Sequence, residues 1–203
     1  MSQNRRGLFI SVEGPNAVGK GTYITALCNK LTNTGYSTHI TKEPTATPLG
    51  MFCKTNEAKL SGLPYAILIA ADRCLHIETE ILPHINKGEI VLTDRYIESS
   101  FVFQKYEGVS YEKIWELNSD FPIPDLSILL LADHETIAQR LVERTKFSVF
   151  EMRMSRQEEL EYYSQAKEFL SAKGFNYLVQ YNNKMDQLEF NIELAAASIL
   201  SLL

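Results

Sequence analysis

Short continuous runs of apolar residues alternate along this chain with longer segments in which apolar residues recur every three or four positions. Continuous apolar runs are typical of parallel strands that are covered on both faces, and the three-to-four spacing indicates amphipathic helices. Strands are expected at residues 8–13, 37–41, 90–93, 126–132 and 177–181. Helices are expected at residues 19–31, 66–86, 111–117, 134–144, 156–172 and 185–202.

The alternation of these segments predicts a doubly wound α/β fold, a five-stranded parallel sheet with helices on both faces. A chain of 203 residues without a repeat or a linker fits one domain over residues 1–203. In such folds ligands bind beyond the carboxyl ends of the strands. Functional residues are therefore expected in the loops that follow the strands.

The first expected strand enters a glycine-rich loop, and an expected helix follows at once. Glycines let consecutive backbone N–H groups turn toward an anion, and a helix N-terminus adds donors and a positive dipole end. Lys20 would bring a full positive charge to the outer phosphates. These features predict a phosphate-binding P-loop, and with it a P-loop NTPase fold. The residues expected to bind the phosphates of a cofactor are Gly14, Asn16, Ala17, Val18, Gly19, Lys20, Gly21 and Thr22.

Composition argues against nucleic-acid and membrane partners and indicates the cellular compartment. A net charge of −5 argues against a protein that neutralises nucleic-acid phosphates broadly. No stretch reaches about 18 apolar residues, so no membrane partner is expected. The polar start leads directly into the first expected strand and leaves no room for a signal peptide. Cys28, Cys53 and Cys74 lack CxxC spacing, so free thiols in a reducing cytoplasm are the expectation.

The second expected strand is followed by Lys42, Glu43 and Pro44. Pro44 and Pro48 are expected to stop the strand and stiffen the loop. A cation and a carboxylate held there suit the phosphate and hydroxyl of an acceptor. An ordinary solvated turn is the alternative.

Arg73 lies in an otherwise apolar part of the expected helix 66–86. A buried arginine needs a partner, and the adjacent Asp72 faces another direction on a helix. Arg73 should therefore point either to a ligand with anionic or carbonyl groups or to a structural salt bridge.

The third expected strand ends at Asp94 and Arg95. Asp94 is expected beside the P-loop, where Mg²⁺ would take few carboxylates together with phosphate oxygens and the hydroxyl of Thr22. Arg95 can bind phosphate with two donors. Ser100 and Gln104 share one helical face and suit the edge of a base, while Phe103 belongs either to that site or to the core.

Four segments in this order and spacing resemble those of thymidylate kinases, within the nucleoside monophosphate kinases. They are residues 9–14 leading into the P-loop, residues 41–44 with 47–50, residues 71–73, and residues 94–96 with 99–100 and 103–104. Residues 124–126, and 140–144 before Phe150 and Glu151, also fit. The resemblance runs from about residue 8 to about residue 181.

The resemblance implies transfer of phosphate from ATP–Mg²⁺ to a pyrimidine deoxynucleoside monophosphate, dTMP foremost. It implies a homodimer, and a lid at about 144–155 that brings a catalytic cation beside Lys20, Asp94 and Arg95. The candidates for this cation are Arg144, Lys146 and Arg153, of which Arg144 is favoured by its position. The base edge is expected at Arg73, Ser100 and Gln104, and the acceptor phosphate at Lys42 and Arg95. Further acceptor contacts are expected at Glu13, Glu43, Pro44, Ile69, Ser99 and Phe103.

The chain departs from the family pattern at several of these positions. Lys42 replaces a usual arginine, Asn16 stands where an acidic residue is usual, and Ile69 stands where a stacking aromatic ring is usual. The family's catalytic arginine is missing both at Ala17 and at Val149. We therefore expect slow turnover, because a supplied arginine is worth about 10³-fold or more in phosphoryl transfer.

Two other functions remain open from the residues. A kinase of the same fold with a hydroxyl acceptor, such as a deoxynucleoside, would use Glu43 as general base. Residues 183–186 match the Asn-Lys-x-Asp guanine pattern, but no Asp-x-x-Gly occurs, and a GTP switch needs that sequence. No close cluster of His39, His76, His84 and His134 is expected, so no histidine is assigned to a metal or to catalysis.

Overall fold

The structure is a computed structural model that describes residues 6–142 and 149–203. Its centre is a five-stranded sheet in the order β2-β3-β1-β4-β5, and every pair of neighbours is parallel. The strands are β1 (Phe9–Glu13), β2 (Thr38–Lys42), β3 (Ile90–Asp94), β4 (Leu126–Leu131) and β5 (Tyr177–Tyr181). The predicted fold and all five predicted strands are confirmed, with ends that differ by at most one residue.

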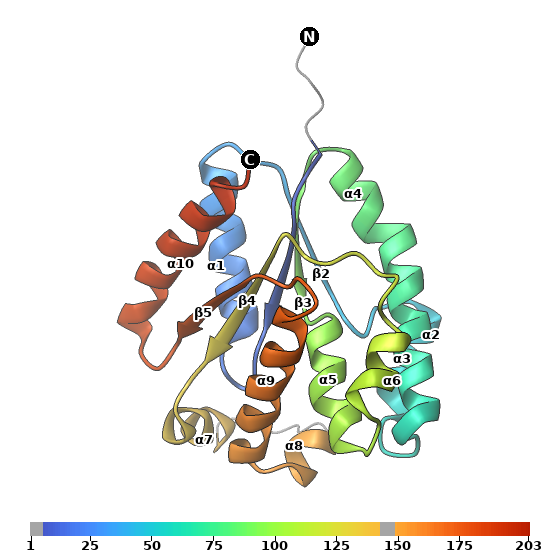
Figure 1. Cartoon of the computed structure of the whole chain (residues 1–203). Helices are drawn as coiled ribbons and strands as arrows, with labels where there is room; N and C mark the ends of the chain where they lie inside the picture. Colours follow the sequence, from blue (N-terminus) through green and yellow to red (C-terminus); the bar gives the residue numbers. More distant parts are fainter. Residues whose placement is uncertain (1–5, 143–148) are drawn as a thin grey trace.

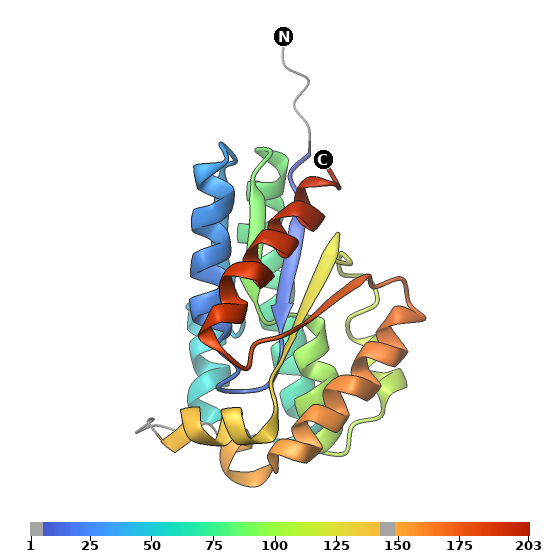
Figure 2. The same ribbon diagram turned by 90° about the vertical axis from the view of Figure 1, so that its left-hand side faces the viewer.

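Helices cover both faces of the sheet (Figures 1 and 2). One face packs on α1 (Lys20–Asn33) and α10 (Met185–Leu200), which contact each other around Leu27 and Ala195. The other face carries most of the remaining helices. These are α2 (Pro48–Asn56), α3 (Gly62–His76), α4 (Leu82–Asn86), α5 (Ile97–Tyr106), α6 (Tyr111–Glu116) and α9 (Arg156–Ser171).

The long helix predicted over residues 66–86 is divided. A π-helical turn, η1 (Ile77–Ile81), joins α3 to α4, and the N–H of Leu82 bonds to the carbonyl of Ile77. Pro83 follows directly. A proline ring clashes with the carbonyl four residues earlier and has no N–H to donate, so a locally widened turn lets the helix continue.

Helix α2 was not predicted from the sequence, because Pro48 was interpreted as stiffening a loop. Pro48 is the first residue of the helix, where its missing N–H costs nothing. Thr47 caps this end by accepting a hydrogen bond from the N–H of Gly50 at 3.2 Å. The segment after β2 therefore turns at once into a helix that packs against α3.

All five strands point toward the same end of the molecule, and the loops that follow them gather there (Figure 1). Helices α7 (His134–Val142) and α8 (Val149–Arg153) lie at this end. Both described chain ends lie at the opposite one. Among the described residues, no helix is long and apolar enough to cross a membrane.

Candidate active site

The loop between β1 and α1 contains two glycines at positions where a side chain would not fit. Gly14 has φ 141°, and a Cβ there would lie 2.1 Å from the carbonyl oxygen of Leu130. Gly19 has φ 100°, and a Cβ there would lie 2.8 Å from Nδ2 of Asn182. The loop therefore passes close to the end of β4 and to the loop after β5, and it delivers its backbone to the N-terminus of α1, as a P-loop requires.

Lys20 reaches back across this loop. Its Nζ donates to the carbonyl oxygens of Gly14 at 2.8 Å and Pro15 at 3.1 Å. Burial and the nearby charge of Arg95 lower the pKa of Lys20 to about 8, although Asp94 and Glu13 act in the opposite direction. A bound polyphosphate would favour the charged lysine, so the site is prepared for a strongly anionic ligand.

Two residues that the sequence analysis did not assign support the P-loop from outside. The carbonyl oxygen of Val18 accepts from Nη1 of Arg140 at 2.9 Å and from Nδ2 of Asn182 at 2.8 Å. Arg140 lies in α7, and Asn182 follows β5. The adjacent Asn183 accepts a hydrogen bond from the N–H of Asp133 at 2.8 Å. Asn183, the first residue of the Asn-Lys-x-Asp pattern, thus links the loop after β5 to the loop after β4.

A cavity opens over the P-loop and the end of β3. Its lining residues are Asn16, Ala17, Gly19, Lys20, Gly21, Thr22, Asp94 and Arg95. Oδ1 of Asp94 is buried and has no hydrogen-bond partner among the described residues. Thr22 lies in the first turn of α1. A carboxylate, a hydroxyl and room for phosphate oxygens are the donor set that Mg²⁺ prefers, so the residues present fit this ion.

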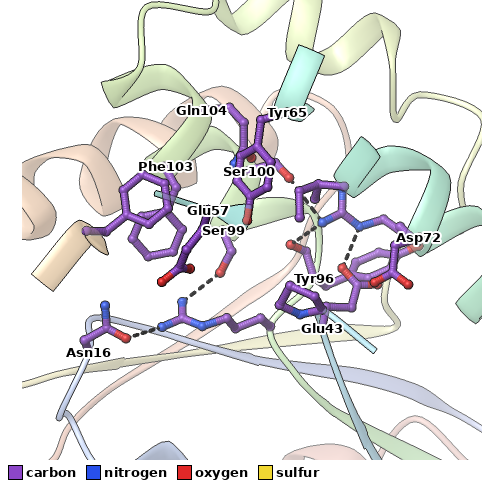
Figure 3. Close-up of a pocket in the computed structure, with 15 residues that line it drawn as sticks. Asn16, Glu43, Glu57, Tyr65, Asp72, Tyr96, Ser99, Ser100, Phe103 and Gln104 are labelled. Atoms are coloured by element: carbon purple, nitrogen blue, oxygen red, sulfur yellow. Dashed lines mark hydrogen bonds and ion pairs between the residues drawn. The ribbon is translucent and has the colours of Figure 1, made fainter. Parts of the chain in front are cut away.

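A second cavity lies between α3, α5 and the ends of β2 and β3 (Figure 3). Nine residues predicted to bind the acceptor line it: Glu43, Pro44, Ile69, Arg73, Arg95, Ser99, Ser100, Phe103 and Gln104. Five further residues, to which the sequence pattern gives no role, also line it: Glu57, Tyr65, Asp72, Tyr96 and Phe150. Tyr65 stands one helical turn before Ile69, so an aromatic ring is present close to the position where the family pattern places one.

Arg73 is held at the back of this cavity and is 1% exposed. Its Nε donates to Oε2 of Glu43 at 2.8 Å, and its Nη2 donates to Oγ of Ser100 at 3.1 Å. Its Nη1 also bonds to Asn118, and Asp72 turns away to the N–H and hydroxyl of Thr45. Both interpretations of Arg73 are therefore compatible with the geometry: it forms a salt bridge and also lines the cavity.

Helix α5 forms another wall of this cavity through Ser99, Ser100, Phe103 and Gln104. Oε1 of Gln104 is buried without a hydrogen-bond partner among the described residues. Phe103 is 8% exposed, and the guanidinium carbon of Arg95 lies 5.0 Å from its ring centroid. Phe103 therefore belongs both to the core and to the cavity wall. The amide oxygen of Gln104 is free to accept a hydrogen bond from a ligand in the cavity.

Arg95 and Asn16 line both cavities. Nη2 of Arg95 donates to Oδ1 of Asn16 at 2.7 Å, and Nη1 donates to Ser99 and to the hydroxyl of Tyr163. Burial works against the charge of Arg95, but Tyr163, Glu13 and Asp94 more than offset it and raise the pKa of Arg95. A permanent positive charge therefore stands where the two cavities meet.

Glu13 lies behind this junction and is fully buried. Its Oε1 accepts from the N–H of Tyr96 at 2.6 Å, and its Oε2 accepts from the hydroxyl of Ser99 at 2.8 Å. It does not line either cavity. Glu13 thus holds the backbone next to Arg95, a residue whose own φ is 75°.

Other predicted residues lie elsewhere. Lys42 is exposed and lines a groove with Asp94, apart from the Arg73 cavity. Val18 is buried in the core and meets the site through its carbonyl oxygen. Arg144 lies outside the described residues, as do residues 144–148 of the expected lid. Glu159 of α9, which the sequence analysis did not assign, accepts from the N–H of Asn16 at 3.0 Å.

Comparison with known proteins gives one family. The family model for thymidylate kinase matches residues 12–192 of the chain. A probable thymidylate kinase of Caldivirga maquilingensis is 41% identical over 148 residues, 71% of this chain and 72% of that one. That of Pyrococcus abyssi is 33% identical over 181 residues, 84% and 88% of the two chains. That of Staphylothermus marinus is 33% identical over 199 residues, 95% and 96% of the two chains.

Proposed function

The chain belongs to the thymidylate kinase family, which makes it a nucleoside monophosphate kinase, and we propose that it transfers the γ-phosphoryl group of ATP to dTMP. The observation that carries this proposal is the junction of the two cavities at Asn16 and Arg95. One cavity has the P-loop of a triphosphate site, and the other has polar and aromatic walls suited to a nucleotide. A guanidinium between them suits two phosphate groups that approach each other.

The donor site is proposed to work by charge neutralisation. Lys20 would contact the outer phosphates, while Asp94 and Thr22 would hold Mg²⁺ at the end of β3 and the start of α1. The ion neutralises charge on the transferring group when it is bound. The backbone N–H groups of the P-loop would hold the remaining phosphate oxygens. Arg140 and Asn182 would keep the loop in this shape through the Val18 carbonyl.

The acceptor base is proposed to lie against α5. Thymine offers an acceptor at O4 and a donor at N3, and one side-chain amide can satisfy both. Gln104 has a buried amide oxygen that no described residue bonds to, and Ser100 lies one turn earlier on the same helix. Phe103 and Tyr65 supply apolar faces for the ring. This arrangement supports a pyrimidine with a donor at N3.

The acceptor phosphate is proposed to lie at Arg95. A phosphate oxygen is already anionic, so transfer to it needs no general base. The main rival function, a kinase for a hydroxyl acceptor, would need Glu43 as that base. Glu43 instead accepts from Nε of Arg73 at 2.8 Å and bonds to the ring of His76 at 3.1 Å, so its oxygens already serve to position two side chains.

A coupled assay of ADP formation with ATP–Mg²⁺ tests the proposal against a panel of dTMP, dUMP, dCMP, dGMP, AMP and thymidine. We expect dTMP to give the highest kcat/KM and thymidine to be inert. Arg95→Ala should abolish use of dTMP, and Arg95→Lys should retain part of it, because Lys keeps the charge and loses the second donor. Phosphorylation of thymidine, or a preference for a purine nucleotide, would refute the proposed acceptor.

A homodimer is proposed from the apolar side chains that α2 and α3 leave exposed. Met51, Phe52, Leu63, Ile67 and Leu75 are each between 37% and 49% exposed. A second copy of this chain would bury them as a self-complementary patch. Light scattering should give twice the mass of the chain, and Ile67→Asp should give the monomer. A wild-type monomer at micromolar concentration would contradict this proposal.

The remaining proposals concern organisation and compartment. We propose one kinase domain over residues 1–203, with a lid that includes α8. We also propose a cytoplasmic location, supported by Cys28, Cys53 and Cys74, which are all free thiols in the structure. Localisation of a tagged full-length chain by fractionation tests this last point.

A further inference from the structure

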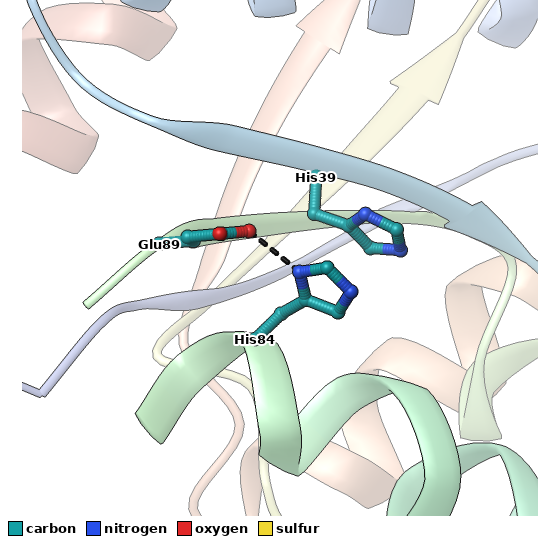
Figure 4. Close-up of side chains that lie close together, drawn as sticks. All are labelled: His39, His84 and Glu89. Carbon is teal, nitrogen blue, oxygen red and sulfur yellow. Dashed lines mark hydrogen bonds and ion pairs between the residues drawn. The ribbon is translucent and has the colours of Figure 1, made fainter. Parts of the chain in front are cut away.

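Two histidines far apart in the sequence stack on each other. The rings of His39 and His84 lie 3.6 Å apart between centroids, with an angle of 12° between their planes (Figure 4). The expectation that the histidines form no close cluster is therefore wrong for this pair. The pairing of β2 with β3, in which His39 lies beside Val91, brings the residues together. The turn at Gly88 then folds α4 and its His84 back beside them.

Each ring of this pair also contacts a carboxylate. Nδ1 of His84 lies 2.6 Å from Oε2 of Glu89, and Nε2 of His39 lies 2.8 Å from Oε1 of Glu80. A carboxylate on one ring nitrogen fixes the orientation of a histidine and makes its other nitrogen a better ligand. Glu80 thus orients His39 and leaves its Nδ1 as the nitrogen available to an ion. Glu89 has a different part, because it is itself a candidate ligand and must move away from Nδ1 of His84 for both atoms to bind one ion.

The side chains of this cluster must turn before they can share an ion. One ligand atom from each of His39, His84 and Glu89 lies within 4.8 Å of the other two. A tetrahedral ion with bonds of about 2.0–2.1 Å needs ligand atoms about 3.3 Å apart. The two stacked rings lie at 12° to each other, so their in-plane lone pairs run nearly parallel and one ring must tilt to face the same ion. All three side chains are of intermediate burial, which leaves room for this rotation. We propose that His39, His84 and Glu89 bind one divalent transition-metal ion, Zn²⁺ foremost, with water as the fourth ligand.

The choice of ion follows from the donors. Imidazole nitrogens favour Zn²⁺, Co²⁺, Ni²⁺ and Cu²⁺, whereas Mg²⁺ favours oxygen ligands in an octahedron. The proposed site is also separate from the P-loop cavity, since none of its three residues lines that cavity. Its ligands come from β2, from α4 and from the residue just before β3, so a bound ion would tie the edge strand of the sheet to the helix that covers it.

The test uses full-length protein with all thiols reduced and Mg²⁺ in excess. Calorimetric titration with Zn²⁺ should give one site per chain, and Zn²⁺ should raise the melting temperature of the wild type. His39→Ala and His84→Ala should weaken Zn²⁺ binding at least about 100-fold, because loss of a second-shell partner alone costs about 10–100-fold. Glu80→Gln should weaken it by about 10-fold. His134→Ala, at an exposed histidine of α7, is the matched control and should behave as wild type.

A Co²⁺ titration identifies the ligands independently. The complex should show the visible bands of a tetrahedral or five-coordinate ion with nitrogen and oxygen donors, without a thiolate charge-transfer band. Circular dichroism of the metal-free variants checks that they fold. The proposal is overturned if the wild type binds no Zn²⁺, if folded His39→Ala and His84→Ala bind it as the wild type does, or if Co²⁺ reports thiolate ligands. The kinase activity is measured separately with dTMP, so failure of either proposal leaves the other distinguishable.

Discussion

The carboxylate of Glu43 and the guanidinium of Arg73 form a buried ion pair between the loop after β2 and helix α3. Their atoms Oε2 and Nε are 2.8 Å apart, and the side chains are 5% and 1% exposed. His76 contacts the second oxygen of Glu43 at 3.1 Å. Glu43 therefore fixes the position of the arginine that lines the acceptor cavity.

Glu43→Gln is expected to lower stability and acceptor affinity together. The change leaves the buried charge of Arg73 without a counter-ion, and breaking a buried pair costs about 3–5 kcal/mol. We expect a loss of about 3 kcal/mol in urea unfolding and a raised KM for dTMP. Glu116→Gln, at an exposed salt bridge, should change stability by less than about 1 kcal/mol. If Glu43 were a general base, Glu43→Gln would remove the acidic limb of the pH–rate profile. We expect this limb to be unchanged in the variant.

Lys20→Ala is expected to reduce kcat by at least about 100-fold, the scale of losing one electrostatic stabiliser in a site of this type. Among the described residues, Lys20 donates its hydrogen bonds to two P-loop carbonyls, so the melting temperature should change little. Lys30→Ala, at the end of the same helix, is the control. Near-normal turnover of a folded Lys20→Ala protein would refute the P-loop assignment.

Arg140→Ala is expected to raise the KM for ATP by about 10-fold, because a hydrogen bond from a charged group contributes about 1.5–3 kcal/mol. The arginine supports the P-loop through the Val18 carbonyl at 2.9 Å. Arg140→Lys should raise the KM for ATP less than Arg140→Ala does. Gln139→Ala, at an exposed position of the same helix, is the control and should keep the wild-type KM. Steady-state kinetics with varied ATP measures the effect. An unchanged KM for ATP with reduced kcat would indicate a direct catalytic role instead.

Glu98 is a buried carboxyl group that lies beneath the site. Ser11 donates to its Oε1 at 3.0 Å, and its Oε2 has no hydrogen-bond partner among the described residues. Burial, and then the nearby charge of Glu13, raise the pKa of Glu98 to about 8. The folded protein therefore binds a proton at Glu98 in a pH range where the unfolded chain has released it.

This raised pKa predicts how stability depends on pH. The contribution of Glu98 is fully present below about pH 4.5 and is lost as the pH rises through about 8. The free energy of unfolding should fall over this range by up to about 1.4 kcal/mol per pH unit relative to Glu98→Gln. Urea unfolding at pH 5.5, 7 and 8.5 measures it, with Glu112→Gln as the exposed control. Parallel pH curves for wild type and Glu98→Gln would contradict the prediction.

Local pattern sufficed for much of the fold. The five strands, the glycine-rich loop and the shared helical face of Ser100 and Gln104 follow from apolar runs and residue spacings that a few neighbouring positions contain. Where the pattern misled, the cause was also local. Pro48 opens a helix as readily as it closes a strand, and Pro83 is accommodated by one widened turn instead of ending the helix.

What the sequence determined by itself is thus the order of the strands and of most helices, and the residues at the carboxyl end of each strand, because apolar periodicity and motif spacing depend on positions close together in the chain. Only the tertiary structure decided that Asn182 and Arg140 meet at Val18, that Glu13 lies behind Tyr96, and that His39 stacks on His84. Those contacts depend on strand order, register and helix packing across the sheet, which are properties of the whole folded chain.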